Sequence, residues 1–432
     1  MKLSEVLYDW GTEAGRALLP RTPFLPEKMK RSVEGRRDLL GRIERWASEQ
    51  RRDGPLVWIH APSVGEGLQA RPVIQALREL RPELQIFYSF FSPSAEKLAT
   101  QLPVDNADYL PFDVIADVTQ ALEAVKPDVF VFGKVDVWPN ITRVARWRDV
   151  KLALVSATLP PNSTRLRWPT RNVLSPAYER LDVVGAISQE DASRLTQLGV
   201  PATRIQVTGD ARFDQVWERA QGIDRAEPPV SLLAGHDGLT FVAGSTWPED
   251  ERHLVRALAH LRGRHPGLRA VIVPHEPTED HLTRLEAHLK MGELGHALLS
   301  QIESGAPSSG EVVVVDKVGV LSELYALADI AYVGGGFGRR GLHSVLEPAA
   351  LGAPVLFGPR HSNAREAGEL IERGGALSVG DWAALEAKLG RWLDDAAARG
   401  RAGTAALDYV KANLGAGQRN AELVLGLLQS DQ

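Results

Sequence analysis

The residues from Gly334 to Pro359 constrain the fold of this chain more than any other stretch. They read GGGFGRRGLHSVLEPAALGAPVLFGP and follow a short apolar segment, Ile330–Val333. Three glycines open the run, a helix is expected to begin near His343 and end at Gly352, and an apolar strand follows at Pro354–Phe357. Such a unit of a parallel sheet places backbone N–H groups and the positive end of a helix dipole at the carboxyl edge of the sheet, where they suit a phosphate. Glycine lets the backbone approach that ligand closely. The stretch therefore predicts the nucleotide-binding half of a group transferase.

Short apolar segments alternate with longer amphipathic ones along most of the 432 residues. Continuous apolar strands separated by helices are typical of parallel sheets covered on both faces. The expected strands are Leu56–Ala61, Gln85–Phe91, Asp128–Phe132, Leu152–Ser156, Val183–Ile187 and Ile205–Thr208, and then Leu239–Ala243, Ala270–Val273, Val312–Val315, Ile330–Val333 and Val355–Phe357.

Residues 219–238 interrupt this alternation with Pro228-Pro229 and several glycines, so we interpret them as a linker. We expect an α/β chain with two Rossmann-like, doubly wound domains that place two ligands face to face across a cleft. The expected parts are an N-terminal segment at 1–52, a first domain at 53–218, the linker at 219–238, a second domain at 239–400, and a C-terminal helix at 401–432 that packs back on the first domain.

The composition excludes several classes of function. Apolar residues make up 44% of the chain and charged residues 24%, as in ordinary globular proteins, and no apolar run is long enough to span a bilayer. The net charge of -5 gives no indication of a nucleic-acid partner. The chain has no cysteine, which excludes disulfides, zinc–thiolate sites and cysteine nucleophiles and fits a cytoplasmic location.

The N-terminal segment combines an amphipathic pattern with positive charge. Leu3–Leu19 has apolar residues near helical spacing, and a stretch rich in arginine and lysine continues to Arg52. Glu5, Asp9 and Glu13 interrupt the apolar run that a signal peptide needs. An apolar helix beside basic residues can lie on an anionic membrane surface. The alternative is a helix that packs on its own domain with a solvated charged face.

Loops of the second domain are expected at the sheet edge where open α/β folds bind ligands. Ser245 and Thr246 follow the first strand and precede a helix, where small hydroxyl residues either cap the helix or hold a phosphate. Lys317 and Gly319 lie in a loop after a later strand, whose backbone can hydrogen-bond a base edge.

Charged residues of the glycine-rich stretch have two interpretations each. Glu347 either accepts hydrogen bonds from ribose hydroxyls or faces solvent. His343 and Glu347 stand four residues apart, as two metal ligands on a helix would, but no third ligand is nearby and no metal is expected. Arg339 and Arg340 either offset phosphate charge or are solvated.

In the first domain, the loop Ser63-Val64-Gly65-Glu66 joins the first strand to the first helix. A carboxylate at that position can act as general base for an acceptor hydroxyl, or merely stabilise the helix dipole. The loop after another strand brings three different side chains to the same edge: Lys134, Asp136 and Trp138.

Together these loops resemble those of the 3-deoxy-D-manno-octulosonic acid (Kdo) transferases of lipopolysaccharide synthesis. The similarity extends in order from about Leu56 to Leu377. The motifs that carry it are Ser63–Glu66, Val137–Asn140, Thr208–Asp210 with Phe213-Asp214, Ala243–Thr246, and Gly334-Gly335 through Leu346–Pro348 to Phe357–Pro359.

The resemblance implies a GT-B fold and an inverting, metal-independent transfer of Kdo from CMP-Kdo to a hydroxyl of the lipid A precursor lipid IVA. It also implies a peripheral position on the cytoplasmic face of the bacterial inner membrane and no cofactor besides the donor substrate. Glu66 would be the catalytic base, and the acceptor would meet Ser63, Gly65, Lys134, Asp136 and Trp138. The donor would meet Ser245, Thr246, His275, Lys317, Gly319, Gly335, Gly336, Arg339, Arg340, His343, Ser344 and Glu347.

The chain departs from the family pattern at three motifs. The common Glu-Thr-Glu-Leu-Trp-Pro appears as Lys134–Pro139, so Asp136 stands where an acceptor-side glutamate is usual. Pro-Arg-His-Pro appears as Pro274–Pro277, so a donor-side arginine is absent, and Arg339 or Arg340 is hypothesised to replace it. Gly-Gly-His-Asn appears as Arg340–Ser344. The alternatives are a transferase or epimerase of the same architecture that uses another nucleotide sugar, and a degenerate member that only binds ligand.

Overall fold

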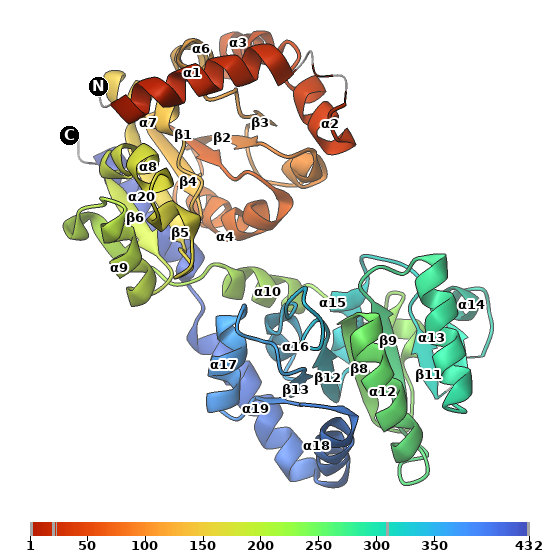
Figure 1. Cartoon of the computed structure of the whole chain (residues 1–432). Helices are drawn as coiled ribbons and strands as arrows, with labels where there is room; N and C mark the ends of the chain where they lie inside the picture. The colour runs from red at the N-terminus through yellow and green to blue at the C-terminus, as the bar shows by residue number, and fades with distance from the viewer. Residues whose placement is uncertain (1–2, 20–21, 23, 308–310, 430–432) are drawn as a thin grey trace. The chain divides into compact units, whose positions relative to one another are not determined.

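The computed structural model describes residues 3–19, 22, 24–307 and 311–429. These residues form two compact units (Figure 1). The first contains residues 1–215 and 414–432, and the second contains residues 216–413.

The first unit is built on a parallel sheet of seven strands in the order β3-β2-β1-β4-β5-β6-β7. Its central strands are buried along their whole length, which explains their continuous apolar sequences. The strands are β1 (Leu56–His60), β2 (Gln85–Phe90), β3 (Asn106–Tyr109), β4 (Val129–Gly133), β5 (Lys151–Ala157), β6 (Val183–Ala186) and β7 (Ile205–Val207).

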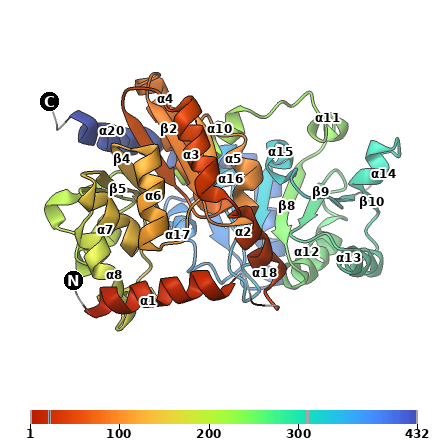
Figure 2. The same cartoon turned by 90° about the horizontal axis from the view of Figure 1, so that it is seen from above.

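Helices connect these strands and cover the sheet. The chain end returns to this unit as α20, which packs against α4 (Figure 2). The helices are α1 (Leu3–Leu18), α2 (Glu27–Gly35), α3 (Leu39–Gln50), α4 (Val64–Leu80), α5 (Glu96–Ala99), α6 (Ile115–Val125), α7 (Pro139–Trp147), α8 (Thr170–Glu179), α9 (Gln189–Gln197) and α20 (Ala416–Gln429), and α10 (Arg212–Gln221) spans the boundary with the second unit.

The second unit repeats the design with the strand order β10-β11-β9-β8-β12-β13-β14, again all parallel. Its strands are β8 (Thr240–Thr246), β9 (Arg269–Pro274), β10 (His296–Leu298), β11 (Val312–Val314), β12 (Ile330–Val333), β13 (Val355–Phe357) and β14 (Ala376–Ser378). Its helices are α11 (Val230–Leu233), α12 (Pro248–Leu261), α13 (Glu279–Met291), α14 (Leu299–Glu303), α15 (Leu321–Leu324), α16 (Leu346–Ala350), α17 (Arg365–Glu372), α18 (Trp382–Asp394) and α19 (Ala396–Ala412).

Both strand orders confirm the expected α/β class and show where each sheet reverses its direction of growth. In the first unit the reversal lies between β1 and β4, and in the second it lies between β8 and β12. Loops that leave the carboxyl ends of two such strands diverge to opposite faces and leave a crevice for ligands. The strand order therefore indicates that ligands bind at the loops after β1 and β4 in the first unit, and at those after β8 and β12 in the second.

Three strands were not predicted from the sequence, and all three lie at sheet edges. They are β3, β10 and β14, each of three or four residues. An edge strand has a neighbour on one side only and is often short and mixed in polarity, so it lacks the apolar run by which the central strands are recognised.

Two helix predictions were wrong. The single C-terminal helix expected at 401–432 is, up to residue 429 where the described part of the chain ends, two helices, α19 and α20, separated at Gly415, whose φ of +89° ends the helical path. Asp214 accepts hydrogen bonds from the N–H groups of Gly415 (2.6 Å) and Gly417 (2.8 Å), so the motif residue Asp214 holds the start of α20. The helix expected from His343 begins only at Leu346.

Candidate functional site

The loop after β1 places Glu66 in the first turn of α4, beside two polar partners. Ser63 Oγ donates a hydrogen bond to Glu66 Oε2, and Lys134 Nζ lies 3.3 Å from Glu66 Oε1. Lys134 belongs to the loop after β4, on the neighbouring strand. The structure thus brings together two loops that the sequence assigned separately to one sheet edge.

Glu66 is held in its ionised form. Burial by itself would raise the pKa of Glu66, but the Ser63 hydroxyl and the Lys134 ammonium together outweigh it and lower the pKa below the usual value. Glu66 retains 21% of its side-chain exposure, so a ligand can reach it. An ionised, accessible carboxylate is suited to accept a proton from a hydroxyl group.

Asp136 lies in the same loop as Lys134, but its environment differs from that of Glu66. Burial raises the pKa of Asp136, while Arg165 Nη2, 2.8 Å from Asp136 Oδ1, counteracts that effect. Tyr178 donates a hydrogen bond of 2.7 Å to the backbone of Val135 and fixes the loop. Arg165 was missed from the sequence because 29 residues separate it from Asp136 and only the fold makes them neighbours.

Trp138 forms an aromatic wall next to these charges. Its ring stacks on Phe91 with centroids 5.4 Å apart, and His60 approaches its edge. Complete burial lowers the pKa of His60 to about 3, so this histidine is neutral and is not a proton donor at neutral pH. Among the described residues, the ring nitrogens Trp138 Nε1 and His60 Nε2 are buried without a protein hydrogen-bond partner.

Gly67, in the first turns of α4, is a position that only glycine can occupy without rearrangement, whereas Gly65 is not. A side chain on Gly65 would point into open space, with Ser63 Oγ 3.9 Å away. A Cβ on Gly67 would come within 2.6 Å of Leu98 and 2.7 Å of Tyr88 Oη. Gly67 therefore lets α4 pack against its neighbours, whereas Gly65 leaves the approach to Glu66 unobstructed.

The glycine-rich loop after β12 packs tightly against other backbone. A Cβ on Gly334 would lie 2.2 Å from the Ser245 carbonyl oxygen, one on Gly335 would lie 2.0 Å from that of Gly341, and one on Gly336 would lie 2.6 Å from the nitrogen of Gly358. These glycines are required by the contacts between neighbouring loops, independently of any ligand. Close approach to a phosphate stays a prediction beside this packing role.

Asp250, a buried residue in the first turn of α12, holds two of these loops together. Its carboxylate accepts hydrogen bonds from Tyr332 Oη (2.9 Å), from the N–H of Gly335 (2.9 Å) and from the N–H of Trp247 (3.0 Å). Neither Asp250 nor Trp247 was singled out from the sequence, although a carboxylate three residues after a helix start is a recognisable capping signal.

Four side chains from three loops stack beside the glycine-rich loop. Arg340 lies over the ring of Trp247 at 3.7 Å, and Trp247 Nε1 donates to His343 Nε2 at 3.1 Å. The rings of His343 and His275 stack with centroids 4.3 Å apart. Burial lowers the pKa of His343 to about 4, with a further effect of His275. We call these residues, Arg340, Trp247, His343 and His275, the aromatic stack.

Behind the loop after β8 lies a buried polar network. Thr246 is fully buried and its hydroxyl donates to Glu251 Oε1 (2.8 Å), so the side chain of Thr246 supports the loop from inside. His281 Nε2 lies 2.9 Å from Glu251, and His281 Nδ1 lies 2.9 Å from the carbonyl oxygen of Glu276, in the loop that carries His275. The hydrogen bond to Glu251 raises the pKa of His281. Ser245 lies at the adjacent turn with a left-handed φ of 52°.

The other predicted donor-side residues lie in distinct settings. Glu347 accepts a hydrogen bond of 2.8 Å from Ser322 Oγ in α15, which the sequence did not indicate. Lys317 is paired with Glu303 of α14, and Gly319 has a φ of +90°. Arg339 and Ser344 are exposed.

His343 and Glu347 do not lie four residues apart on one helix, as their spacing had suggested. His343 precedes α16 instead of lying on it, and its Nε2 accepts the hydrogen of Trp247. Within the described ranges, no group of three histidine, aspartate or glutamate side chains is arranged to hold a metal ion.

Helix α1 is attached to the first unit through its polar face. Tyr8 Oη donates to the buried Asp113 (2.8 Å), and Arg16 pairs with Asp117 (2.8 Å). The opposite, apolar face is left open: Leu7 is 65% exposed and Trp10 is 77% exposed. The helix runs along the outer edge of this unit in both views (Figures 1 and 2). In residues 3–19, 22, 24–307 and 311–429, no helix is both long enough and apolar enough to cross a bilayer.

Comparison with known proteins identifies the family. The family described as 3-deoxy-D-manno-octulosonic-acid transferase (kdotransferase) matches residues 36–215. The 3-deoxy-D-manno-octulosonic acid transferase of Bordetella pertussis is 30% identical over 389 residues, which cover 86% of this chain and 87% of that protein. This chain belongs to the Kdo transferase family. It is also 26% identical to the 3-deoxy-D-manno-octulosonic acid transferase of Haemophilus influenzae over 377 residues, which cover 86% of this chain and 87% of that protein.

Solved structures place this Kdo transferase family member in the GT-B architecture. UDP-GlcNAc 2-epimerase from Neisseria meningitidis, bound to UDP-GlcNAc, has a TM-score of 0.61 at 14% identity and covers 87% of this chain and 99% of its own. A glycosyltransferase from Rickettsia africae has a TM-score of 0.58 at 13% identity, covering 88% and 100%. At such identities the likeness shows the fold alone. Membership of the Kdo transferases makes this chain a glycosyltransferase.

Proposed function

We propose that this protein transfers Kdo from CMP-Kdo to a hydroxyl group of a lipid A precursor, lipid IVA, with inversion at the anomeric carbon. The observation that carries the proposal is Glu66: in a chain that belongs to the Kdo transferases, an ionised and accessible carboxylate lies where the first sheet reverses its strand order.

In the proposed reaction Glu66 accepts the proton of the acceptor hydroxyl. The oxygen forms a bond to the anomeric carbon of Kdo, and the bond from that carbon to the phosphate oxygen of CMP breaks, so that CMP leaves with the electron pair. Attack opposite the leaving group inverts the configuration. Ser63 and Lys134 keep Glu66 ionised before the proton arrives, and Lys134 stabilises neighbouring negative charge on the acceptor. Asp136 and Trp138 complete the acceptor side, the first by hydrogen bonding and the second by contact with a sugar ring.

On the donor side, we assign the missing family arginine to Arg340 and not to Arg339. Both arginines are exposed loop residues, but the guanidinium of Arg340 lies over the ring of Trp247 at 3.7 Å, whereas among the described residues Arg339 makes no such ring contact. A pre-organised cation loses less conformational entropy when it binds an anion than a free one does. His275, at the position of the family arginine, lies in the same stack and supports this assignment.

The remaining donor contacts follow from the loop positions. We assign the phosphate to backbone N–H groups beside Ser245 and in the glycine-rich loop, since oriented backbone dipoles can stabilise the leaving CMP without a metal. Glu347, positioned by Ser322, is assigned to the ribose hydroxyls, and the loop containing Gly319 to the cytosine edge.

We further propose that α1 attaches the protein to the cytoplasmic face of the inner membrane. Two features of α1 support this. Its polar face fixes the helix to the first unit. Its apolar face presents Leu7, Trp10 and Leu18 to the outside, where they can enter a membrane surface.

The decisive experiment incubates the full chain with CMP-Kdo and lipid IVA, with and without EDTA, and follows the acceptor by mass spectrometry. The expected result is a gain of Kdo that EDTA does not affect, with the inverted linkage in the product's NMR spectrum. UDP-GlcNAc serves as a control donor. No gain of Kdo mass would overturn the proposal, turnover of UDP-GlcNAc instead would favour an epimerase or another transferase, and loss of activity in EDTA would refute the metal-free mechanism.

A further inference from the structure

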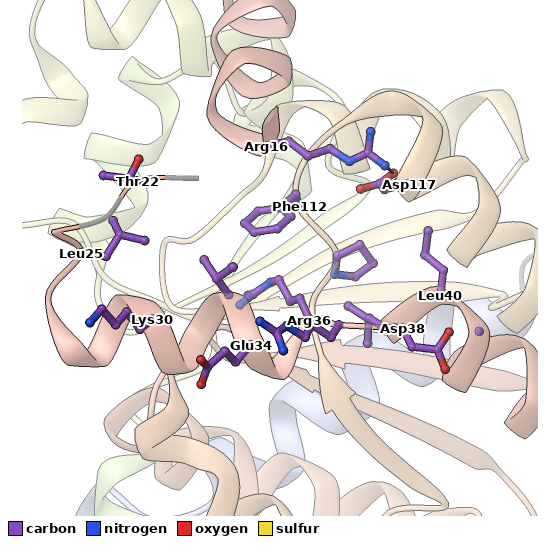
Figure 3. A pocket seen from close by; sticks show the side chains of 15 residues that line it. Arg16, Thr22, Leu25, Lys30, Glu34, Arg36, Asp38, Leu40, Phe112 and Asp117 are labelled. Carbon is purple, nitrogen blue, oxygen red and sulfur yellow. Dashed lines mark ion pairs between the residues drawn. The ribbon is translucent and has the colours of Figure 1, made fainter. Parts of the chain in front are cut away.

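A cavity of about 560 Å³ lies within the first unit, and none of the residues assigned above to donor or acceptor lines it. It is bounded by the last turn of α1, by α2, by the start of α3 and by the segment before α6 (Figure 3). Its volume is within the range of roughly 300–1,000 Å³ that small-molecule sites occupy. It is therefore large enough for a ligand, and its lining indicates which kind.

One part of the lining is apolar, formed by Leu25, Val33, Leu40 and Phe112. The same part of the molecule is apolar toward solvent: Phe24, next to Leu25, is 93% exposed. An apolar lining that opens beside exposed apolar side chains suits a hydrocarbon chain better than a water-soluble metabolite.

The other part of the lining carries an excess of positive charge. Two of its carboxylates are already neutralised: Asp117 pairs with Arg16 at 2.8 Å, and Asp38 pairs with Arg45 at 2.8 Å. The lining charges that remain are Lys30, Arg36 and Arg37 against Glu34. Among the described residues, no ion pair joins any of those three cations to a carboxylate.

Arg36 is the most informative of these cations because its side chain is buried. Its guanidinium donates to the carbonyl oxygens of Leu110 (2.8 Å) and Ser32 (2.7 Å), which are neutral partners. It also lies over the rings of Phe91 (4.2 Å) and Phe112 (5.1 Å). Burial lowers the pKa of Arg36 to about 10, so it is still charged at neutral pH. The nearby Asp108 counteracts this burial only in part and is itself paired with Arg42. A buried charge without a direct ion-pair partner is costly, and an anion in the cavity would relieve that cost.

We propose that this cavity binds one phosphate-bearing acyl lipid, with its phosphate beside Lys30, Arg36 and Arg37 and an acyl chain along Leu25, Val33 and Leu40. The site goes beyond the proposed transfer reaction, from which it takes only the expectation that the protein works at a membrane. Two lipids share this chemistry, an anionic phospholipid of the bilayer and the acyl acceptor itself.

The test is native mass spectrometry of the full chain released from detergent micelles that contain either dioleoyl-phosphatidylglycerol or lipid IVA, with inorganic phosphate as a third probe. Val33→Trp fills the cavity, which has room for an indole, without changing charge. Arg37→Glu reverses one lining charge. Lys28→Glu is the matched control, because Lys28 is an exposed cation of α2 that does not line the cavity.

We expect a one-to-one lipid adduct on the wild type and on Lys28→Glu, reduced about tenfold in Arg37→Glu and Val33→Trp, and no adduct with phosphate alone. Equal retention by all four proteins, or no lipid on the wild type, would overturn the proposal. If phosphatidylglycerol is retained and the variants keep the wild-type KM for lipid IVA, the occupant is a bilayer lipid. If only the KM for lipid IVA rises, with that for CMP-Kdo unchanged, the occupant is the acceptor. A chain that retains lipid but transfers no Kdo would refute the proposed function and leave this site standing.

Discussion

Replacing Glu66 with glutamine tests the proposed base with almost no change of shape. Glutamine keeps the side-chain length and can still accept a hydrogen bond from Ser63, but it cannot take a proton. General base catalysis contributes about 10²–10⁴ in rate, so kcat should fall by that factor. That loss corresponds to roughly 3–5 kcal/mol of barrier, at about 1.4 kcal/mol for each factor of ten.

The structure separates this effect from damage to the fold. The substitution breaks the pair with Lys134, whose atoms are 3.3 Å apart and whose side chains are 35% and 21% exposed. An ion pair as exposed as this contributes at most about 1 kcal/mol, so the Tm should fall by only about 2–4 °C. Glu79→Gln, at an exposed position on the same helix α4, makes the same chemical change away from the loop and should leave both kcat and Tm unaltered.

The pH profile gives a second readout. Ser63 and Lys134 lower the pKa of Glu66, so kcat should decline only below the usual pKa of glutamate. The stabilisation that accompanies this depressed pKa is present above the unfolded-state pKa and is lost as the pH falls through the folded-state value. Lys134→Met should raise the pKa of Glu66 and move the acidic limb of kcat to higher pH. Glu66→Gln with more than a tenth of the wild-type kcat, or an acidic limb that Lys134→Met leaves in place, would refute the assignment.

Three further predictions concern the second unit. Arg340→Ala should raise the KM for CMP-Kdo about tenfold in steady-state assays, since one charge-assisted hydrogen bond is worth about 1.5–3 kcal/mol. The matched Arg339→Ala should change this KM less than twofold, and equal effects of the two substitutions would contradict the assignment of Arg340. Asp250→Ala leaves three buried donors unpaired and should cost about 4 kcal/mol, or about 10 °C in the Tm by calorimetry, and a shift under 3 °C would contradict the role of Asp250 in joining the loops. The pKa of His281 is raised by Glu251, so its stabilisation is complete below the unfolded-state value of about 6.5 and is lost as the pH rises through the folded-state value. The urea midpoint of His281→Phe should therefore fall below the wild type at pH 6 and approach it at pH 9, and parallel midpoints would exclude the effect.

Helix α1 shows how far an amphipathic pattern can be interpreted. The spacing of its apolar residues correctly predicted a helix, but the pattern alone left two orientations open. The tertiary structure turned the polar face inward, because the first unit presents buried partners such as Asp113 that Tyr8 can reach only in this orientation. The apolar face is consequently exposed. In the alternative orientation, with the charged face in solvent, the apolar face would have been buried.

The glycine-rich stretch gives the same lesson at the level of a loop. The apolar segments on either side predicted its position between two strands, but not why its glycines are needed. The backbone atoms that crowd these glycines belong to Ser245, Gly341 and Gly358, which come from other loops or from the far side of the same loop. The expected helix at His343 failed for a related reason. His343 is held by Trp247, a distant residue, and the chain becomes helical only at Leu346.

What the sequence determined by itself is therefore what depends on local periodicity and on order along the chain. The buried strands, most connecting helices, the two repeated α/β series and the loop carrying Glu66 all follow from runs of neighbouring residues. Only the tertiary structure decided which loops meet, because strand order joins β1 to β4 and β8 to β12 across long separations in sequence. The pairing of Glu66 with Lys134 and the aromatic stack around Arg340 are consequences of that order. The basic cavity beside α1 depends instead on how α1, α2 and α3 pack against the segment before α6.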